Sequence, residues 1–285
     1  MYNTKYKERV MTYTKISIIL KDKPPYFIGS QIRGGLGHAL KKVTCINPSY
    51  SCDGCFATSN CLYYEFYEEK NIFHKYRLNF DLGLELYNFD FYLFDSAITK
   101  LPYVVSAFHM LLTQIGLGKD KKTYNNFDMF INDENCFINN KLHLPQNFTK
   151  TFQIDNFCPN IILEFVTQLR IKKDNVYIRN NEIALDDIVN SIYQRQMKLL
   201  GREFKKFPYQ IRGDIVSKDL VFKELSRYSN RQKTDMKLGG IVGTMEIKNL
   251  SIETYNILKV GELIGVGKST VFGLGKIKVN KLGLL

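Results

Sequence analysis

The C-terminal segment, residues 261–279, places a lysine and a serine among closely spaced glycines, as phosphate-binding loops do. A P-loop needs a glycine five residues before its Gly-Lys pair, but Glu262 occupies that position, and a strand-like stretch follows where a P-loop has a helix. The segment is therefore not a nucleotide-binding loop. A glycine-rich segment still exposes backbone N–H groups and lets another backbone approach closely. Lys268 and Ser269 are thus candidates for contacting a phosphodiester chain, and a glycine-loosened turn into an edge strand is the alternative.

Four of the six cysteines lie in one short polar segment with the spacing C-x6-C-x2-C-x5-C: Cys45, Cys52, Cys55 and Cys61. The turn at Asp53-Gly54 lets two of these thiolates grip one ion, and a loop of this length has little else to order it. We predict a structural tetrahedral zinc site, with an iron–sulfur cluster as the alternative. His74 is a minor candidate ligand. Cys136 and Cys158 have no partner pattern and are expected to be small buried residues.

The chain has only four histidines, which limits the candidates for proton transfer. A helix is predicted from Ser30, its expected cap, to about Val43, and its apolar positions repeat at helical spacing. A rotation of about 100° per residue then places His38 on the opposite face, next to lysines. Such a histidine can move protons near neutral pH while lysines stabilise the charge on an attacked phosphate. The alternative is a histidine that is merely solvated.

Two basic segments in the second half could contact nucleic acid. A long helix predicted over residues 185–206 carries a single-sign basic face that includes Arg195 and Arg202. The segment RYSNRQKTDMK mixes arginine, amide and aromatic groups, the combination used for phosphates, base edges and stacking in single-stranded RNA recognition. Its candidates for binding RNA are Arg227, Arg231, Gln232, Lys233 and Lys237.

The charge of the whole chain agrees with a polyanionic partner. The net charge is +12, with 17 Lys+Arg against 14 Asp+Glu up to residue 145 and 23 against 14 beyond it, so the second half is the better candidate for the main binding surface. An AT-rich genome also enriches lysine, so charge alone decides little. No run approaches the roughly twenty apolar residues that span a bilayer, and the first residues lack a signal-peptide block. We expect a cytoplasmic protein with no membrane partner.

The order strand, helix, strands, helix, strand is predicted twice, which is the pattern of two ferredoxin-like domains in tandem. The predicted fold is α+β, with two ferredoxin-like (RRM-like) domains over residues 1–150 and 151–285 and the cysteine-rich metal-binding insertion at about 43–62 in the first.

Several of these segments together resemble one protein family. FIGSQIRGGLGHALKKVTC, CDGC, RYSNRQK, LGGIVG and GVGKSTVFGLGKIKV are similar to segments of the CRISPR-associated repeat-RNA processing endoribonucleases of the RAMP superfamily, in the branch with a four-cysteine insertion. The glycine-rich end specifies the superfamily only. The arginine-glycine helix start, with Arg33 as a further RNA-binding candidate, the cysteines and RYSNRQK narrow the resemblance to the family.

The resemblance implies metal-independent cleavage of precursor CRISPR RNA within its repeats, by attack of a 2′-hydroxyl on the adjacent phosphate to leave a cyclic phosphate and a 5′-hydroxyl. It implies His38 as the general base, with Tyr26 and either Lys41 or Lys42 for positioning and charge stabilisation, and cysteines that are structural. It also implies CRISPR repeat RNA as a partner, with subunits of a CRISPR effector complex as further partners.

Two other functions stay open at this point. One is a RAMP subunit that holds guide RNA without cutting it. The other is a zinc-containing nucleic-acid-binding regulator whose cysteine segment contacts DNA.

Overall fold

The computed structural model describes residues 10–139, 141–179, 182–203, 205–229 and 234–282. The chain forms two compact units, residues 1–151 and 152–285. The division falls one residue from the predicted boundary. Among the described residues, no helix is both long and apolar enough to cross a membrane.

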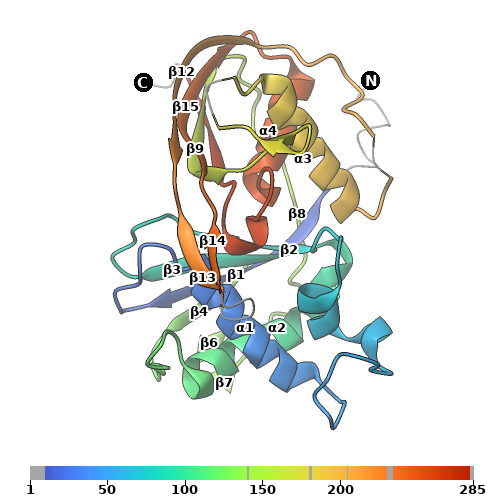
Figure 1. The fold of residues 1–285 in the computed structure, drawn as a ribbon, viewed down its shortest axis with the longest axis vertical. Coiled ribbons are helices and arrows are strands. Elements are labelled where there is room, and N and C mark those ends of the chain that lie inside the picture. The colour runs from blue at the N-terminus through green and yellow to red at the C-terminus, as the bar shows by residue number, and fades with distance from the viewer. Residues whose placement is uncertain (1–9, 140, 180–181, 204, 230–233, 283–285) are drawn as a thin grey trace. The chain divides into compact units, whose positions relative to one another are not determined.

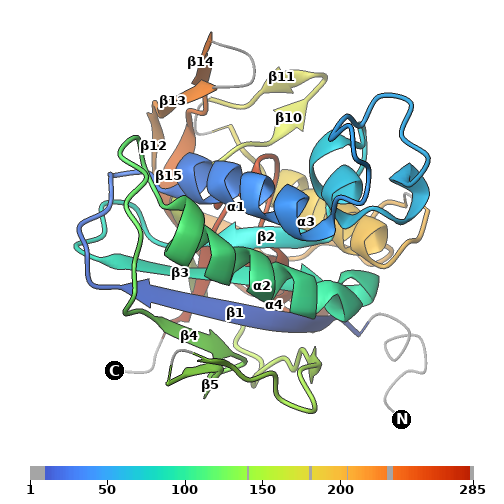
Figure 2. The same ribbon diagram turned by 90° about the horizontal axis from the view of Figure 1, so that it is seen from below.

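The first unit is built on an antiparallel sheet whose central strand is the first in the chain. The elements follow in the order β1 (Thr12–Leu20), α1 (Gly29–Thr44), β2 (Tyr76–Asn79), β3 (Tyr87–Phe94), α2 (Leu101–Met110) and β4 (Asp128–Ile131). The strand order is β2-β3-β1-β4, extended at the edge by β5 (Glu134–Asn135), while β8 (Lys150–Thr151) also pairs with β1. Both helices lie across one face of this sheet (Figure 2). This is the ferredoxin-like arrangement.

Alternation along the strands explains the burial of this sheet. Ile16, Ile18 and Leu20 of β1 are fully buried, because residues two apart in a strand point to the same face. Ile18 lies opposite Phe89 on one side and Met129 on the other. The helices add the rest of the core from their apolar stripes.

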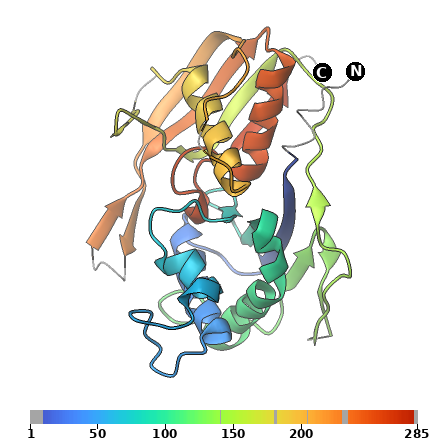
Figure 3. The ribbon, with the colours of Figure 1, turned by 90° about the vertical axis from the view of Figure 1, so that its right-hand side faces the viewer.

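The second unit repeats the arrangement with its own sheet. Its elements are β9 (Ile161–Leu169), α3 (Leu185–Leu199), β12 (Asp214–Lys223), β15 (Gly240–Lys248), α4 (Ile252–Ile264) and β16 (Ile277–Lys281). The strand order is β12-β15-β9-β16, and all of its pairings are antiparallel. Helices α3 and α4 lie side by side (Figures 1 and 3). The two sheets have the same topology, so the predicted tandem ferredoxin-like fold fits the structure, whereas a metal-binding insertion is not shown.

Short elements decorate the two sheets. Three small hairpins are β6 (Phe137–Ile138) with β7 (Lys141–Leu142), β10 (Lys172–Lys173) with β11 (Val176–Tyr177), and β13 (Ser226–Ser229) with β14 (Thr234–Lys237). Single turns of 3₁₀- or π-helix span Thr58–Asn60, Tyr64–Glu68, Asp95–Lys100, Leu111–Ile115 and Thr270–Phe272. The sequence analysis did not predict the hairpins of the second unit.

Two predicted helix ends differ from the structure. Helix α1 begins at Gly29, so Ser30 lies inside the helix and cannot cap it; its hydroxyl is buried without a hydrogen-bond partner. Helix α3 ends at Leu199 instead of near residue 206. Gly201 follows with a φ of 66°, in the left-handed region where glycine terminates helices at little cost.

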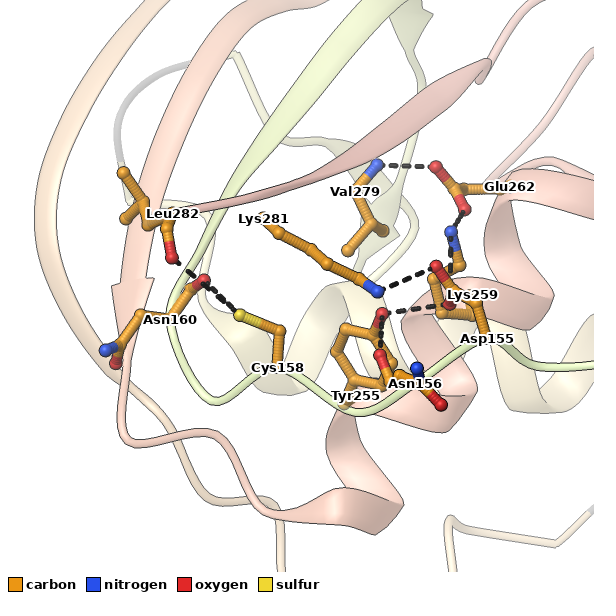
Figure 4. A network of polar contacts seen from close by, with 10 residues as sticks. All are labelled: Asp155, Asn156, Cys158, Asn160, Tyr255, Lys259, Glu262, Val279, Lys281 and Leu282. Atoms are coloured by element: carbon orange, nitrogen blue, oxygen red, sulfur yellow. Dashed lines mark hydrogen bonds and ion pairs between the residues drawn. The ribbon is translucent and has the colours of Figure 1, made fainter. Parts of the chain in front are cut away.

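A polar network fastens the entry of the second unit to its last helix and last strand (Figure 4). The Asp155 carboxylate accepts a hydrogen bond from the Tyr255 hydroxyl at 3.0 Å and pairs with the ammonium of Lys281 at 3.1 Å. Lys259 of α4 pairs with both Asp155 and Glu262, and Glu262 accepts the backbone N–H of Val279 at 2.6 Å. The network thus joins residues more than a hundred positions apart in the sequence.

Candidate active site and nucleic-acid interface

Helix α1 presents His38 and Lys42 to solvent. Ile32, Leu36 and Leu40 are buried at about one-helical-turn intervals, and His38 lies on the exposed side, as predicted. An exposed imidazole on a rigid helix can approach a bound phosphodiester and accept the proton of a hydroxyl that attacks it. Among the candidate bases, His38 therefore has the accessibility that the predicted role requires.

Lys41 is turned toward the cysteine segment. Its ammonium lies 4.9 Å from the centre of the Tyr63 ring and 5.8 Å from that of Tyr50. Lys41 is also only half-exposed, and a cation held over aromatic faces stabilises packing. Of the two lysines, Lys42 is the one that the structure leaves exposed for stabilising charge on a phosphate.

Arg33 of α1 is held by two tyrosines from outside the helix, Tyr67 and Tyr76. Its guanidinium lies 4.7 Å from the Tyr67 ring centre, its Nε donates to the Tyr76 hydroxyl at 3.2 Å, and the Tyr67 hydroxyl donates to the Arg33 carbonyl at 2.8 Å. Burial lowers the pKa of Arg33, but the neighbouring tyrosines more than offset this, so its pKa is raised. The geometry makes Arg33 a clamp between α1 and the segment after the cysteines.

Tyr26 lies before α1 with its side chain 60 % exposed. Its carbonyl accepts the Gly83 N–H at 3.0 Å, and its ring packs so closely on Gly83 that a Cβ there would lie 3.2 Å from it. The residue is anchored through its backbone while most of its side chain is exposed. Its predicted positioning role stays a prediction.

The four clustered cysteines are free and half-buried. Cys45 and Cys61 lie near enough to Cys52 to act on its thiol electrostatically. Burial raises the pKa of the Cys52 thiol, the charge of Lys41 opposes that rise, and Cys61 and Cys45 add to it electrostatically. Within the described residues, no three His, Cys, Asp or Glu side chains are close enough to hold a metal ion. The donor set suits zinc, but the thiols would have to move closer together to bind it. The other two cysteines were expected to be buried; Cys136 is, whereas Cys158 is only half-buried.

The glycine-rich segment forms a loop packed against β9, and it does not wrap a nucleotide. Gly267 and Gly275 have positive φ, and a Cβ would lie 2.4 Å from the Arg170 carbonyl oxygen at the first and 1.9 Å from that of Val266 at the second. These glycines are therefore required for close backbone approach. Lys268 is exposed at the tip of the loop, and Ser269 is half-exposed in a left-handed conformation.

The predicted basic face of the long helix is only partly exposed. Arg195 is 4 % exposed and its Nε donates to the Ile264 carbonyl at 2.8 Å, so its expected place on a solvated face was wrong. The reason is that α4 packs against this side of α3. Arg202 is exposed, beyond the end of the helix.

The segment RYSNRQKTDMK, residues 227–237, contains most of β13 and all of β14. The Arg227 guanidinium lies 4.4 Å from the ring centre of Phe272 in the glycine-rich loop, and Lys237 is exposed. These contacts bring two separately predicted RNA-binding segments together. Arg231, Gln232 and Lys233 lie outside the described residues.

Comparisons with known families agree with this arrangement. Residues 163–277 match the model of the CRISPR-associated endoribonuclease Cas6, and residues 22–129 match a family described as an N-terminal domain, AF_1859_N. Residues 163–277 of the second unit are thus similar to Cas6. The residues that match Cas6 include the glycine-rich loop and two hairpins, β10–β11 and β13–β14. The family resemblance predicted from the sequence is thereby confirmed, while the four-cysteine branch stays a prediction.

Solved Cas6 structures share the fold over nearly the whole chain. A "Cas6 (TTHB231) product complex" has a TM-score of 0.55 at 14% identity and covers 94% of this chain and 99% of its own. A "Cas6 (TTHA0078) product complex" has a TM-score of 0.55 at 14% identity, covering 95% and 100%. The structure titled "Thermus thermophilus Cas6 (TTHB231)" has 0.51 at 12%, covering 95% and 98%. No curated protein sequence matches the chain significantly.

Proposed function

We propose that this protein is a metal-independent endoribonuclease that cuts precursor CRISPR RNA within its repeats. The observation that carries the proposal is the Cas6 match of residues 163–277. The exposed basic groups of the glycine-rich loop and the β13–β14 hairpin would hold the phosphate backbone of the RNA. The proposed partner is therefore the repeat RNA, with CRISPR effector subunits as recipients of the product.

The proposed reaction needs only groups that this chain supplies. The His38 imidazole accepts the proton of a ribose 2′-hydroxyl, whose oxygen attacks the adjacent phosphorus while the bond from phosphorus to the 5′-oxygen breaks. The product ends are a 2′,3′-cyclic phosphate and a 5′-hydroxyl, the latter formed when the leaving oxygen takes up a proton. Lys42 would stabilise the negative charge that develops on the phosphate, and Tyr26 would position it. The exposure of His38 and Lys42 on one helix supports these roles.

The first test replaces His38 with alanine and measures cleavage of the host's repeat RNA in EDTA. Loss of a general base should slow cleavage by about 10²- to 10⁴-fold without weakening RNA binding. His143→Ala is the matched control, because His143 is another exposed histidine of the same unit and lies outside α1. Cyclic-phosphate ends should appear with the native protein and the control.

Other outcomes favour the alternatives. Cleavage by the His38 variant at the native rate would remove His38 from the mechanism, and loss of native cleavage in EDTA would contradict metal independence. Tight binding without cutting by the native protein would indicate a guide-holding RAMP subunit. A preference for double-stranded DNA would indicate the zinc-containing regulator.

We also propose a structural zinc held by Cys45, Cys52, Cys55 and Cys61. Four thiolates leave no open position for a catalytic water, so the ion would order the insertion and take no part in cleavage. Metal analysis of the purified protein should find about one zinc per chain, lost in the double variant Cys52→Ser, Cys55→Ser and retained in Cys158→Ser. Iron with a brown colour would indicate the cluster instead. Metal-free native protein would contradict both.

A further inference from the structure

A small hairpin of the second unit carries a strongly basic sequence that the proposed function has not used. Residues 170–179 contain four basic side chains against one acidic. Lys172 and Lys173 of β10 are exposed, and Val176 of β11 is 70 % exposed. The turn between the strands is Asp174-Asn175, both with positive φ, as in the two-residue type I′ turns of tight hairpins. The hairpin is thus a defined element that displays cations and apolar surface to solvent.

Arg170 fixes the root of this hairpin to two other elements. It is only 8 % exposed, and its guanidinium donates to the Gly239 carbonyl at 2.7 Å, just before β15. The same guanidinium lies 4.5 Å from the Tyr177 ring centre in β11. Its backbone carbonyl accepts the N–H of Lys268 at 2.8 Å. One buried residue, Arg170, therefore contacts the β10–β11 hairpin, the residues just after β14 and the glycine-rich loop.

Close backbone contacts around Arg170 join several of these elements. Gly267 forms a parallel bridge with Arg170. A Cβ at Gly240 would lie 2.6 Å from the Leu169 carbonyl oxygen, so the start of β15 presses directly on the end of β9. These contacts leave no free space between the glycine-rich loop, the start of β15 and the chain at Leu169 and Arg170.

Three cations of the second unit lie close to aromatic rings. Lys172 lies 5.0 Å from the Tyr177 ring centre, Arg179 lies 5.4 Å from that of Phe222, and Arg227 lies 4.4 Å from that of Phe272. Single-stranded nucleic acid is bound by surfaces of this kind, because lysines neutralise phosphates while exposed apolar and aromatic groups receive base faces.

We propose that Lys172 and Lys173, together with Lys268, form a contact strip for single-stranded RNA, and that Arg170 is the positioning residue that aligns it. The inference rests on the proposed RNA-binding function and extends it to a segment of RNA that follows the hairpin. The strip reads the phosphate backbone and is therefore tolerant of base sequence.

The test measures binding of a fluorescent oligouridylate of about twelve nucleotides to the full chain across a salt series. The double variant Lys172→Ala, Lys173→Ala should bind about tenfold more weakly and lower the slope of log K against log salt by about 1.4, because each phosphate contact on a single strand contributes about 0.7. The control is Lys248→Ala, Lys278→Ala, which removes the same charge from β15 and β16 outside the hairpin. The control should bind and titrate as the native protein does.

The positioning role of Arg170 has its own readout. Arg170→Lys keeps the charge but loses the fork that reaches Gly239 and the planar group over Tyr177. It should weaken oligouridylate binding with an unchanged salt slope, and its effect should be non-additive with that of the lysine pair. Tyr177→Phe keeps the ring and should retain the affinity, whereas Tyr177→Ala should not.

Failure of the inference and failure of the proposed function give different results. Suppose that the native protein binds and cuts repeat RNA, but the Lys172→Ala, Lys173→Ala variant matches the control in affinity and salt slope. The contact strip is then contradicted, while the proposed function stands. Equal weakening toward double-stranded RNA of the same length would overturn the single-strand assignment. A native protein that binds neither RNA overturns the function and the inference together. Circular dichroism confirms that each variant is folded.

Discussion

At the scale of single residues, α1 shows how neighbouring lysines acquire different roles. Lys41 lies over the rings of Tyr63 and Tyr50, whereas Lys42, one position on, faces solvent. The successive side chains of a helix point about 100° apart, so adjacent residues can belong to different surfaces. Lys41 is thereby assigned to packing of the insertion, and Lys42 remains beside His38 for the proposed chemistry.

Asp155 supports a prediction on pH. Burial by itself would raise the pKa of its carboxyl, but hydrogen bonds from Lys281 and Tyr255 and the charges of Lys259 and Lys281 lower the pKa below its ordinary value. A carboxylate with a depressed folded-state pKa stabilises the protein above its unfolded pKa of about 3.9, and this stabilisation is lost as the pH falls through the lower folded value.

Asp155→Asn should therefore lower the free energy of unfolding by about 1 kcal/mol at pH 7, a value kept small because the carboxylate is half-exposed and screened. The difference from the native protein should shrink below about pH 4. Urea unfolding at both pH values measures it, with Asp219→Asn, an exposed carboxylate of β12, as control. A constant difference across this range would contradict the assigned network.

At the level of elements, two glycines of α1 differ in the space around them. At Gly34 nothing lies within 4 Å of an added Cβ, whereas at Gly37 such an atom would lie 2.7 Å from Cε1 of the Tyr67 ring. The Tyr67 ring is held in place by its hydrogen bond to the Arg33 carbonyl. Because Gly37 has no side chain, the Tyr67 ring of the segment after the cysteines can pack directly against α1.

Gly34→Ala should stabilise the protein by about 0.5–1 kcal/mol, because alanine loses less backbone entropy in a helix. Gly37→Ala gains the same helix propensity but must displace the ring, so it should destabilise the protein by about 1–3 kcal/mol. Thermal unfolding of the two variants measures this opposition. Equal stabilisation by both would show that Tyr67 does not pack on Gly37.

The hairpins of the second unit show which elements could have been recognised earlier. The Asp-Asn pair between two short polar and apolar runs is a turn signal for β10–β11. The strands are only two residues long, too short for alternation to be informative. The significance of the hairpin comes from Arg170, whose burial no local pattern predicts.

At the scale of the whole molecule, two sheets with the same topology divide the charge unequally. The first 145 residues carry 17 Lys+Arg against 14 Asp+Glu and the others 23 against 14. The excess includes the hairpin lysines and the glycine-rich loop, all inside the residues that match Cas6. Binding of a polyanion should therefore depend steeply on salt, through the second unit above all.

Local sequence patterns predicted the order of the main elements, the two ferredoxin-like sheets, the resemblance to the Cas6 family and the exposed position of His38. These follow from short-range periodicity and motif spacing, because residues two apart in a strand or three to four apart in a helix share a face. Three side-chain placements depend on tertiary packing. Arg195 is buried under α4, Lys41 packs on tyrosines, and Arg170 links two hairpins to the glycine-rich loop. Each of these depends on a partner distant in the chain, and no local pattern specifies which distant surface a side chain will meet.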